Sequence, residues 1–235
     1  MKKFILFKKV GWIVILIVFM ASLKAQAQFV TTWVTDDTEI TIPTFSSETY
    51  DYNITWTNLT NAGIGDGSSS SITSSYTITG LTNGDIYQVE IDGLFPRIYF
   101  NNGGDKEKIL TVEQWGSNPW TSMGAAFYGC SNLTIPASDA PDLSGVTNMS
   151  TMLRGTTSFN NDISSWDVSS VTNMSGLFRD ASLFNQPLDT WFDKLGNVTV
   201  FNFMFLGATS FNQNLNSWII NTTADVSMSS MFEGA

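Results

Sequence analysis

Histidine is absent from the 235 residues, and Cys130 is the only cysteine. Without histidine, the chain has no imidazole for general acid–base catalysis and no Cys/His nucleophilic pair. The usual zinc sites need several cysteine or histidine ligands, and a single cysteine cannot form a disulfide within the chain. The sequence therefore predicts a protein that has no metal centre and no cofactor and that is not an enzyme.

Basic residues are scarce, and they are unevenly distributed. The chain has 11 lysines and arginines against 21 acidic residues. Five of the lysines lie in residues 1–27, which contain no acid, so the other residues carry six basic and 21 acidic side chains and a net charge of −15. Nucleic acids and anionic membrane surfaces repel a protein of that charge. Neither is expected to be a partner.

Residues 1–27 have the pattern of a secretory signal peptide. Several lysines precede a largely apolar segment over 10–23, and Ala25 and Ala27 form a small-x-small cleavage site before Gln28. The apolar segment is shorter than the roughly 20 residues that a membrane span needs, although a retained N-terminal anchor is the alternative. We expect a protein that is secreted or held on the outer cell surface, and that is not inserted in a membrane after the signal is removed.

Residues 28–95 have the alternating pattern of β-strands. Apolar and polar residues alternate in Glu39–Ile42, Tyr50–Thr57 and Tyr87–Ile91, whereas 61–71 has the glycine and serine content of a loop. Short strands between such turns are typical of a small antiparallel β-sandwich. The segment Tyr76–Val89 resembles a fibronectin type III or immunoglobulin-like module. We expect this sandwich to cap the rest of the chain.

The remaining sequence, from about residue 96 to the end, is dominated by an internal repeat. Trp166, Trp191 and Trp218 follow one another at 25 and 27 residues. Each lies 17 residues after a methionine or phenylalanine, so the two extra residues of the longer unit belong to a loop over 192–197. A fixed period of this size is the signature of stacked repeats, in which one unit cannot bury its apolar face alone.

Within one repeat the apolar spacing changes once. Val171, Met174 and Phe178 have the spacing of one stripe of a short helix, while Trp166 and Val168 alternate as in a short strand. This predicts a mixed α/β fold with a short helix and a short parallel strand in every unit. The regular spacing favours a buried role for the tryptophans over an exposed aromatic ladder. The predicted repeat core consists of Met149, Met152, Phe159, Trp166, Met174, Phe178, Phe184, Trp191, Met204, Phe205, Phe211 and Trp218.

The sequence motif of the repeats resembles that of a known family. The unit Val171-Thr-Asn-Met174-Ser-Gly-Leu-Phe178, followed by Phe184-Asn and Trp191, is similar to the repeat of BspA-like leucine-rich-repeat surface proteins of bacteria. The stretch Trp120–Pro136 resembles a second form of that repeat. The resemblance implies a leucine-rich-repeat solenoid over 96–235 and a role in adhesion or protein binding. Since the sequence stops inside a unit, we expect a solenoid truncated at its C-terminus.

The residues beside the tryptophans are the predicted binding surface, because they differ from one unit to the next. An extracellular protein is the expected ligand, and a glycan is the alternative. The predicted surface consists of Ser165, Asp167, Thr190, Phe192, Ser217 and Ile219.

Acidic pairs are the remaining candidates for chemistry. A carboxylate-dependent glycoside hydrolase needs two carboxylates that face each other across a cleft. The candidate pairs are Asp36 with Asp37, Asp139 with Asp142, and Asp162 with Asp167. Nothing in the sequence implies a cleft between them, so solvated carboxylates are favoured over a hydrolase or weak calcium binding.

Overall fold

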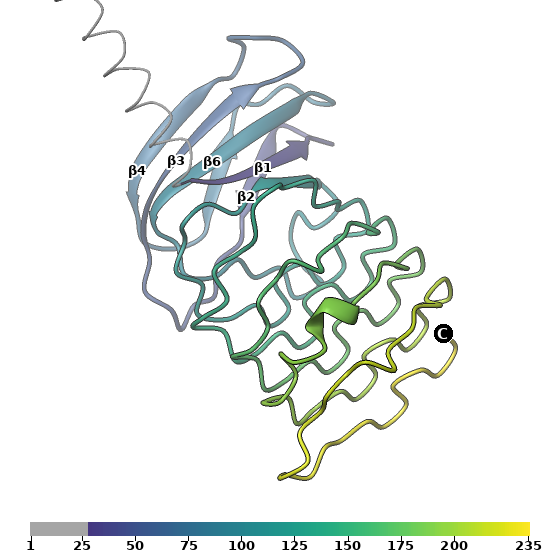
Figure 1. The fold of residues 1–235 in the computed structure, drawn as a ribbon. Helices are drawn as coiled ribbons and strands as arrows, with labels where there is room; N and C mark the ends of the chain where they lie inside the picture. The colour runs from purple at the N-terminus through teal and green to yellow at the C-terminus, as the bar shows by residue number, and fades with distance from the viewer. Residues whose placement is uncertain (1–27) are drawn as a thin grey trace, which may run out of the picture.

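The computed structural model describes residues 28–235, so the predicted signal peptide lies outside the described residues. Seven β-strands gather at one end of the molecule, and the later repeats extend away from them (Figure 1). The strands form a five-stranded sheet of order β4-β3-β6-β1-β7 and a two-stranded sheet of order β2-β5. Their bounds are β1 Phe29–Val34, β2 Glu39–Ile42, β3 Asp51–Asn58, β4 Gly67–Ile72, β5 Tyr76–Thr79, β6 Ile86–Leu94 and β7 Ile109–Gln114.

The strands of the sandwich follow from the alternation in the sequence. In β3 the side chains of Tyr52 and Ile54 are buried between exposed neighbours, and β6 alternates in the same way. The segments predicted to be strands from their alternation are present as β2, β3 and β6. The predicted loop over 61–71 is wrong in its second half, where β4 pairs with β3 and Gly67 lies opposite Trp56. A Cβ atom at Gly67 would overlap the Trp56 ring, so the glycine that suggested a loop is required by the pairing.

The order of the strands contradicts the predicted resemblance to a fibronectin type III or immunoglobulin-like module. In that architecture the sixth strand lies between the third and the seventh. Here β6 lies between β3 and β1, and β7 pairs with the other edge of β1. The Tyr87 hydroxyl does accept a hydrogen bond from the Thr82 amide at 3.1 Å, as a tyrosine corner does. This local feature therefore occurs within a different topology.

Strand β7 joins the sandwich to the repeats. One edge of β7 pairs antiparallel with β1. At its other edge the Thr134 amide donates to the Leu110 carbonyl at 2.8 Å, and the Val112 amide donates to the Thr134 carbonyl at 3.1 Å. The buried apolar side chains of both parts form one cluster, which runs from Phe29 to Met231. The sheet thus extends past the predicted domain boundary at residue 95, and the two parts share a core.

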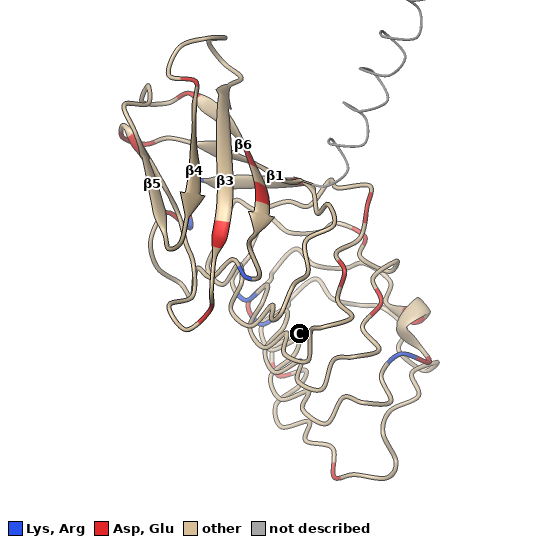
Figure 2. Ribbon diagram, turned by 90° about the vertical axis from the view of Figure 1, so that its left-hand side faces the viewer, with Lys and Arg blue, Asp and Glu red and all other residues tan. Residues whose placement is uncertain are grey.

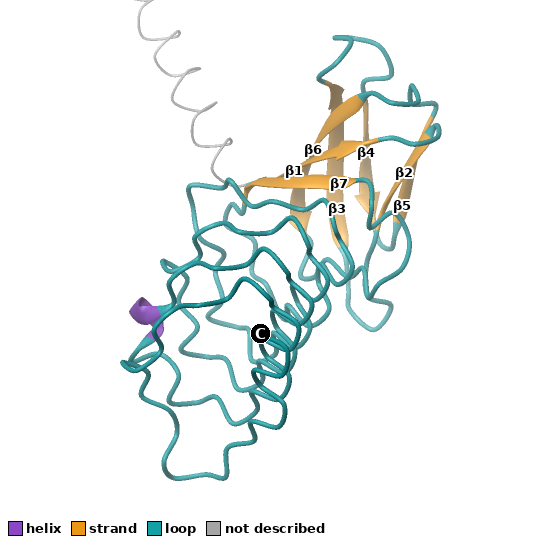
Figure 3. Cartoon of the chain, turned by 90° about the vertical axis from the view of Figure 1, so that its right-hand side faces the viewer, coloured by secondary structure: helices purple, strands orange, loops and turns teal. Residues whose placement is uncertain are grey.

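The repeats contain neither of the elements predicted for them. In residues 115–235, all of which are described, the only helix or strand is the 3-10 turn η1, Asp189–Trp191 (Figure 3). Neighbouring repeats are connected by isolated parallel bridges, such as Asn148 with Asn173 and Val200 with Ser227. The regular structure of the described chain is therefore all-β, in two antiparallel sheets. The predicted mixed α/β fold and leucine-rich-repeat solenoid, with a helix and a strand in each unit, are wrong.

The backbone of the repeats explains why no helix forms. The Met152 amide donates to the Met149 carbonyl three residues earlier, but the Thr151 amide donates to Ser175 of the following repeat at 2.8 Å. Thr151 has φ of 54° and Gly155 has φ of 70°, both in the left-handed region. An α-helix needs right-handed dihedrals and bonds to the fourth preceding residue. The helix-like apolar spacing therefore arises from consecutive turns, and each repeat forms one irregular layer bonded to the next layer.

Equivalent phenylalanines from successive layers stack on one another. The rings are nearly parallel, and the centroids of neighbours in a row are 5.4–5.9 Å apart. Such offset stacking of aromatic rings adds to the stabilisation from burial alone. The two rows are Phe159, Phe184 and Phe211, and Phe178, Phe205 and Phe232.

Candidate binding surface

The six residues of the predicted binding surface are all exposed, and they come from three adjacent layers. Ser165 and Asp167 lie in the first of these layers, Thr190 and Phe192 in the second, and Ser217 and Ile219 in the third. Hydrogen bonds hold the layers together at this surface. The Thr190 hydroxyl donates to the Ser164 carbonyl at 2.6 Å, and the Ile219 amide donates to the Phe192 carbonyl at 2.8 Å. The structure therefore brings the predicted residues together in three neighbouring rows.

The tryptophans beside this surface point into the layers. Trp166 is 2% exposed and Trp191 is fully buried, while Trp218 is half-buried. The Trp218 indole Nε1 donates to the Leu188 carbonyl of the preceding layer at 2.9 Å. The residues on either side of each tryptophan are exposed. The exposed aromatic residue of this surface is therefore Phe192, at 44% exposure.

The other residues of the predicted repeat core are buried in the layers, except for one at the last complete layer. Phe211 is half-buried, and it packs against the buried cluster. The fully buried residues are Met149, Met152, Phe159, Met174, Phe178, Phe184, Met204 and Phe205.

A groove of about 460 Å³ lies on the candidate surface. It crosses two layers, because its lining comes from the turn around η1 and from the corresponding part of the next repeat. Of the predicted surface residues, Phe192 and Ser217 line it. The complete lining is Pro187, Asp189, Phe192, Gln213, Asn214 and Ser217.

Hydrogen bonds fix some of the polar groups in this groove and leave others free. The Gln213 side-chain amide donates to the carbonyl and to the side-chain oxygen of Asn185, both at 2.9 Å. The Asn214 side-chain oxygen accepts a hydrogen bond from the Asn216 amide at 2.9 Å. Within the described residues, the Asp189 carboxylate, the Asn214 Nδ2 group and the Ser217 hydroxyl have no hydrogen-bond partner. These three groups are available to a ligand.

Sequence reasoning missed four of the groove residues, namely Pro187, Asp189, Gln213 and Asn214. A signal for one of them was present in the repeat. Gln186 and Gln213 occupy equivalent positions, and the Gln186 side-chain amide donates to the Asn160 carbonyl as Gln213 does to that of Asn185. The repeated glutamine therefore marks a side-chain ladder between layers, which orients Gln213 at the groove.

The acidic residues considered for hydrolysis accept hydrogen bonds from backbone amides or take part in ion pairs. Both oxygens of Asp139 accept hydrogen bonds from the Trp115 amide at 3.1 Å. The carboxylates of Asp142, Asp162 and Asp167 each accept the amide of the residue two positions later. None of the paired residues lines the groove at Phe192. In the described part of the chain, no group of three or more Cys, Asp or Glu side chains is placed to hold a metal ion.

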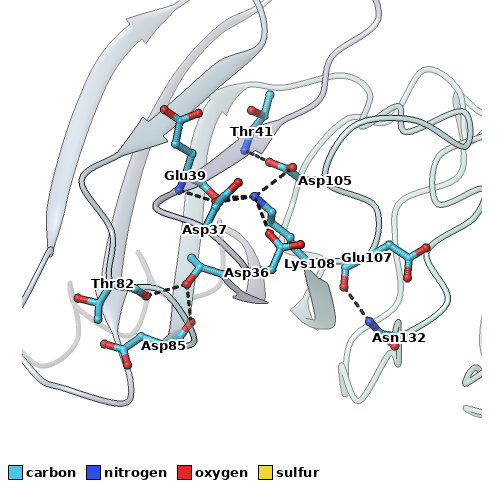
Figure 4. A network of polar contacts seen from close by, with 11 residues as sticks. Asp36, Asp37, Glu39, Thr41, Thr82, Asp85, Asp105, Glu107, Lys108 and Asn132 are labelled. Carbon is cyan, nitrogen blue, oxygen red and sulfur yellow. Dashed lines mark hydrogen bonds and ion pairs between the residues drawn. The ribbon is translucent and has the colours of Figure 1, made fainter.

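Asp36 and Asp37 belong instead to an ion-pair cluster around Lys108 (Figure 4). The Lys108 ammonium lies 2.8 Å from Asp37 Oδ1 and 3.2 Å from both Asp36 Oδ1 and Asp105 Oδ1, and it donates to the Glu39 carbonyl. Its side chain is only 6% exposed. Burial opposes its charge, but hydrogen bonds to the three carboxylates outweigh that effect and raise the pKa of Lys108 to about 12. The cluster fastens the segment before β2 to the segment before β7.

Acidic residues are spread over both parts of the molecule, and basic residues are few (Figure 2). No lysine or arginine lines the groove at Phe192. The candidate surface therefore offers no cationic group to a phosphate or another anion within the groove.

The repeat half of the chain is similar to a protein family. Residues 121–235 match the family model described as "Mycoplasma protein of unknown function, DUF285". No curated protein and no solved structure matches the chain. No helix within residues 28–235 is long and apolar enough to cross a membrane. The predicted resemblance to BspA-like leucine-rich-repeat proteins is therefore wrong on these findings, and the similarity established for the repeat half is to the DUF285 family.

Proposed function

We propose that this is an exported, non-enzymatic protein that binds an extracellular protein partner through the exposed face of its repeat layers and thereby mediates adhesion. One observation carries the proposal. Six exposed residues of differing chemistry lie side by side on three layers, each next to a tryptophan that anchors its layer. Stacked repeats present extended surfaces of this kind to their partners.

The chemistry of the surface supports a binding role. Phe192 and Ile219 are 44% and 60% exposed on adjacent layers, and the backbone hydrogen bond between them fixes their spacing. Exposed apolar groups rimmed by polar groups are typical of interaction sites. The polar neighbours are Ser165, Thr190 and Ser217.

The charge of the chain and its first residues support the proposed location. The net charge of −15 outside residues 1–27 disfavours nucleic acid and anionic lipid as partners. The leader-like composition of residues 1–27 supports export to the cell surface or the medium. The Asp139 carboxylate accepts the distant Trp115 amide, and Asp142 and Asp162 are engaged in local turns, which supports a role without catalysis.

Capture of extracellular proteins tests the proposal. The purified protein would be immobilised and exposed to extracellular-matrix and cell-surface proteins, and bound partners would be quantified against the variant Ser165→Lys/Ile219→Lys. Two lysines placed on the outer rows should weaken capture by about tenfold or more, because the partner would have to desolvate them.

A matched control is Leu59→Lys/Ile64→Lys, which alters two sandwich residues that are 53% and 58% exposed and lie outside the surface. This control should capture its partner as the unmodified protein does. Equal losses in both variants, or no captured protein at all, would count against the proposal.

A further inference from the structure

We propose that the groove beside Phe192 is a binding subsite for a neutral saccharide unit. The inference uses the proposed function only to place a ligand on this face of the layers. It names a ligand class for the groove itself, which is lined by Pro187, Asp189, Phe192, Gln213, Asn214 and Ser217.

The aromatic ring supplies the apolar part of the site. Phe192 directly follows the buried Trp191, and its carbonyl accepts the Ile219 amide at 2.8 Å, so the backbone beneath the ring is fixed. Among the described residues, no other aromatic ring packs against Phe192, although neighbouring phenylalanines of the layers are stacked in rows. An exposed ring on a rigid support is suited to pack against the C–H face of a sugar ring.

The polar groups in the groove match the hydroxyls of a sugar. The Asp189 carboxylate accepts hydrogen bonds, the Asn214 Nδ2 group donates them, and the Ser217 hydroxyl does both. All three lack a partner within residues 28–235, while the bonds of Gln213 and Asn214 to their own neighbours hold their side chains in place. Since each sugar hydroxyl is both donor and acceptor, this mixture can pair with several of them.

Charge decides between a neutral and an acidic saccharide. The lining contains the carboxylate of Asp189 and no basic residue. A sialic acid, uronic acid or sulfate group would meet like charge without a cation to pair with. The groove therefore favours neutral sugars.

Size favours a small ligand within the groove. Its volume of about 460 Å³ falls in the range of roughly 300–1,000 Å³ that is usual for small-molecule sites. A folded protein partner typically contacts about 20–30 residues, far more than the six that line the groove. The volume of the groove is therefore that of a small-molecule site, whereas a folded protein would need the wider surface around it.

An array of immobilised neutral, sialylated and sulfated glycans, probed with the purified protein, tests the proposal. We expect binding to neutral glycans in preference to acidic ones. The change Phe192→Ala should weaken this binding about tenfold, because the stacking surface is lost. Phe192→Tyr keeps the ring and should bind within about threefold of the unmodified protein. Asp189→Ala should also weaken binding, because a hydrogen-bond acceptor is removed.

Leu183→Ala is the matched control, since Leu183 is 54% exposed in the same repeat but does not line the groove. It should leave glycan binding unchanged, and circular dichroism should show that all variants are folded. No binding to neutral glycans, or binding that persists in folded Phe192→Ala, would overturn the inference. If the protein captured a protein partner but bound no glycan, the saccharide subsite would be contradicted and the proposed protein-binding function would stand. Binding of glycans that depends on Phe192, without any protein partner, would support the subsite and contradict the proposed protein partner.

Discussion

Replacing Phe184 by alanine is expected to lower the free energy of unfolding by about 3–5 kcal/mol, the usual cost of removing a buried phenylalanine. The Phe184 ring is fully buried, and its centroid lies 4.0 Å from that of Phe178 in its own layer. It also stacks on Phe159 and Phe211 of the two adjacent layers, at 5.6 and 5.9 Å. Truncation would therefore leave a cavity lined by phenylalanine rings from three layers. Urea unfolding followed by tryptophan fluorescence measures the change.

The adjacent residue gives the control for this experiment. Leu183 is 54% exposed, and surface substitutions away from special features usually change stability by within about 0.5 kcal/mol. Leu183→Ala should therefore unfold at nearly the same urea concentration as the unmodified protein. If Phe184→Ala were no more destabilising than Leu183→Ala, the phenylalanine rows would not be the packed interior of the repeats.

Replacing Lys108 by methionine is expected to lower the free energy of unfolding by about 2 kcal/mol at neutral pH. The substitution keeps an apolar stem of similar length but removes the ammonium from Asp36, Asp37 and Asp105. Hydrogen bonds to charged groups contribute about 1.5–3 kcal/mol to stability. Because the Asp36 and Asp37 side chains are exposed, solvent weakens their attraction to Lys108, and we expect a contribution below the upper end of this range. Urea unfolding of both proteins measures the difference.

The pH dependence of that difference has a defined sign. Folding raises the pKa of Lys108 from 10.5 to about 12, so its contribution is complete below pH 10.5 and is lost as the pH rises through 12. The hydrogen bond from Lys108 lowers the pKa of Asp37 below 3.8, so this contribution is present above pH 3.8 and is lost as the pH falls further. The difference in the free energy of unfolding between Lys108→Met and the unmodified protein should be largest between these two pH limits. It should become smaller below the lower limit and above the upper one.

Lys106→Met is the control for the ion-pair cluster. Within residues 28–235, Lys106 pairs only with the exposed carboxylate of Glu107 at 3.1 Å, and such surface pairs contribute about 0–1 kcal/mol. We expect a small change with little dependence on pH. If Lys108→Met were as stable as the unmodified protein at neutral pH, or if the difference in the free energy of unfolding increased above pH 12, the cluster would not stabilise the fold.

The apolar positions of the repeats could be predicted from the sequence, whereas their backbone could not. Val171, Met174, Leu177 and Phe178 are all fully buried. Their spacing suggested a helix because consecutive turns also return side chains to one side after about three residues. The alternation of turns within a layer and hydrogen bonds to the next layer depends on left-handed residues such as Thr151, which no apolar pattern indicates.

Loops predicted from composition or length are wrong in part where contacts between distant segments determine the structure. The serines of β4 have the composition of a loop, but pairing with β3 and the space for the Trp56 ring make the segment a strand. In the longer repeat the predicted loop over 192–197 contains Leu195, which is fully buried. A loop inferred from an inserted length can therefore still contribute to the core.

Part of the candidate surface could be predicted from the sequence. Variation beside the repeated tryptophans indicated Phe192 and Ser217, which line the groove. Asp189 and Asn214 were not found, because their contribution depends on the turn around η1 and on the stacking of one layer on the next. These contacts join residues more than 20 positions apart, which the local pattern does not encode.

Ring-to-ring nuclear Overhauser contacts are the most direct test of the stacked, irregular layers. In the protein with selectively labelled phenylalanines, contacts are expected between Phe159 and Phe184 and between Phe184 and Phe211, whose centroids are 5.6 and 5.9 Å apart. The amides of residues 149–155 should not show the unbroken sequential contacts of a helix, because alternate amides bond to the next layer. Missing ring contacts together with a continuous helical pattern over 149–155 would contradict this arrangement.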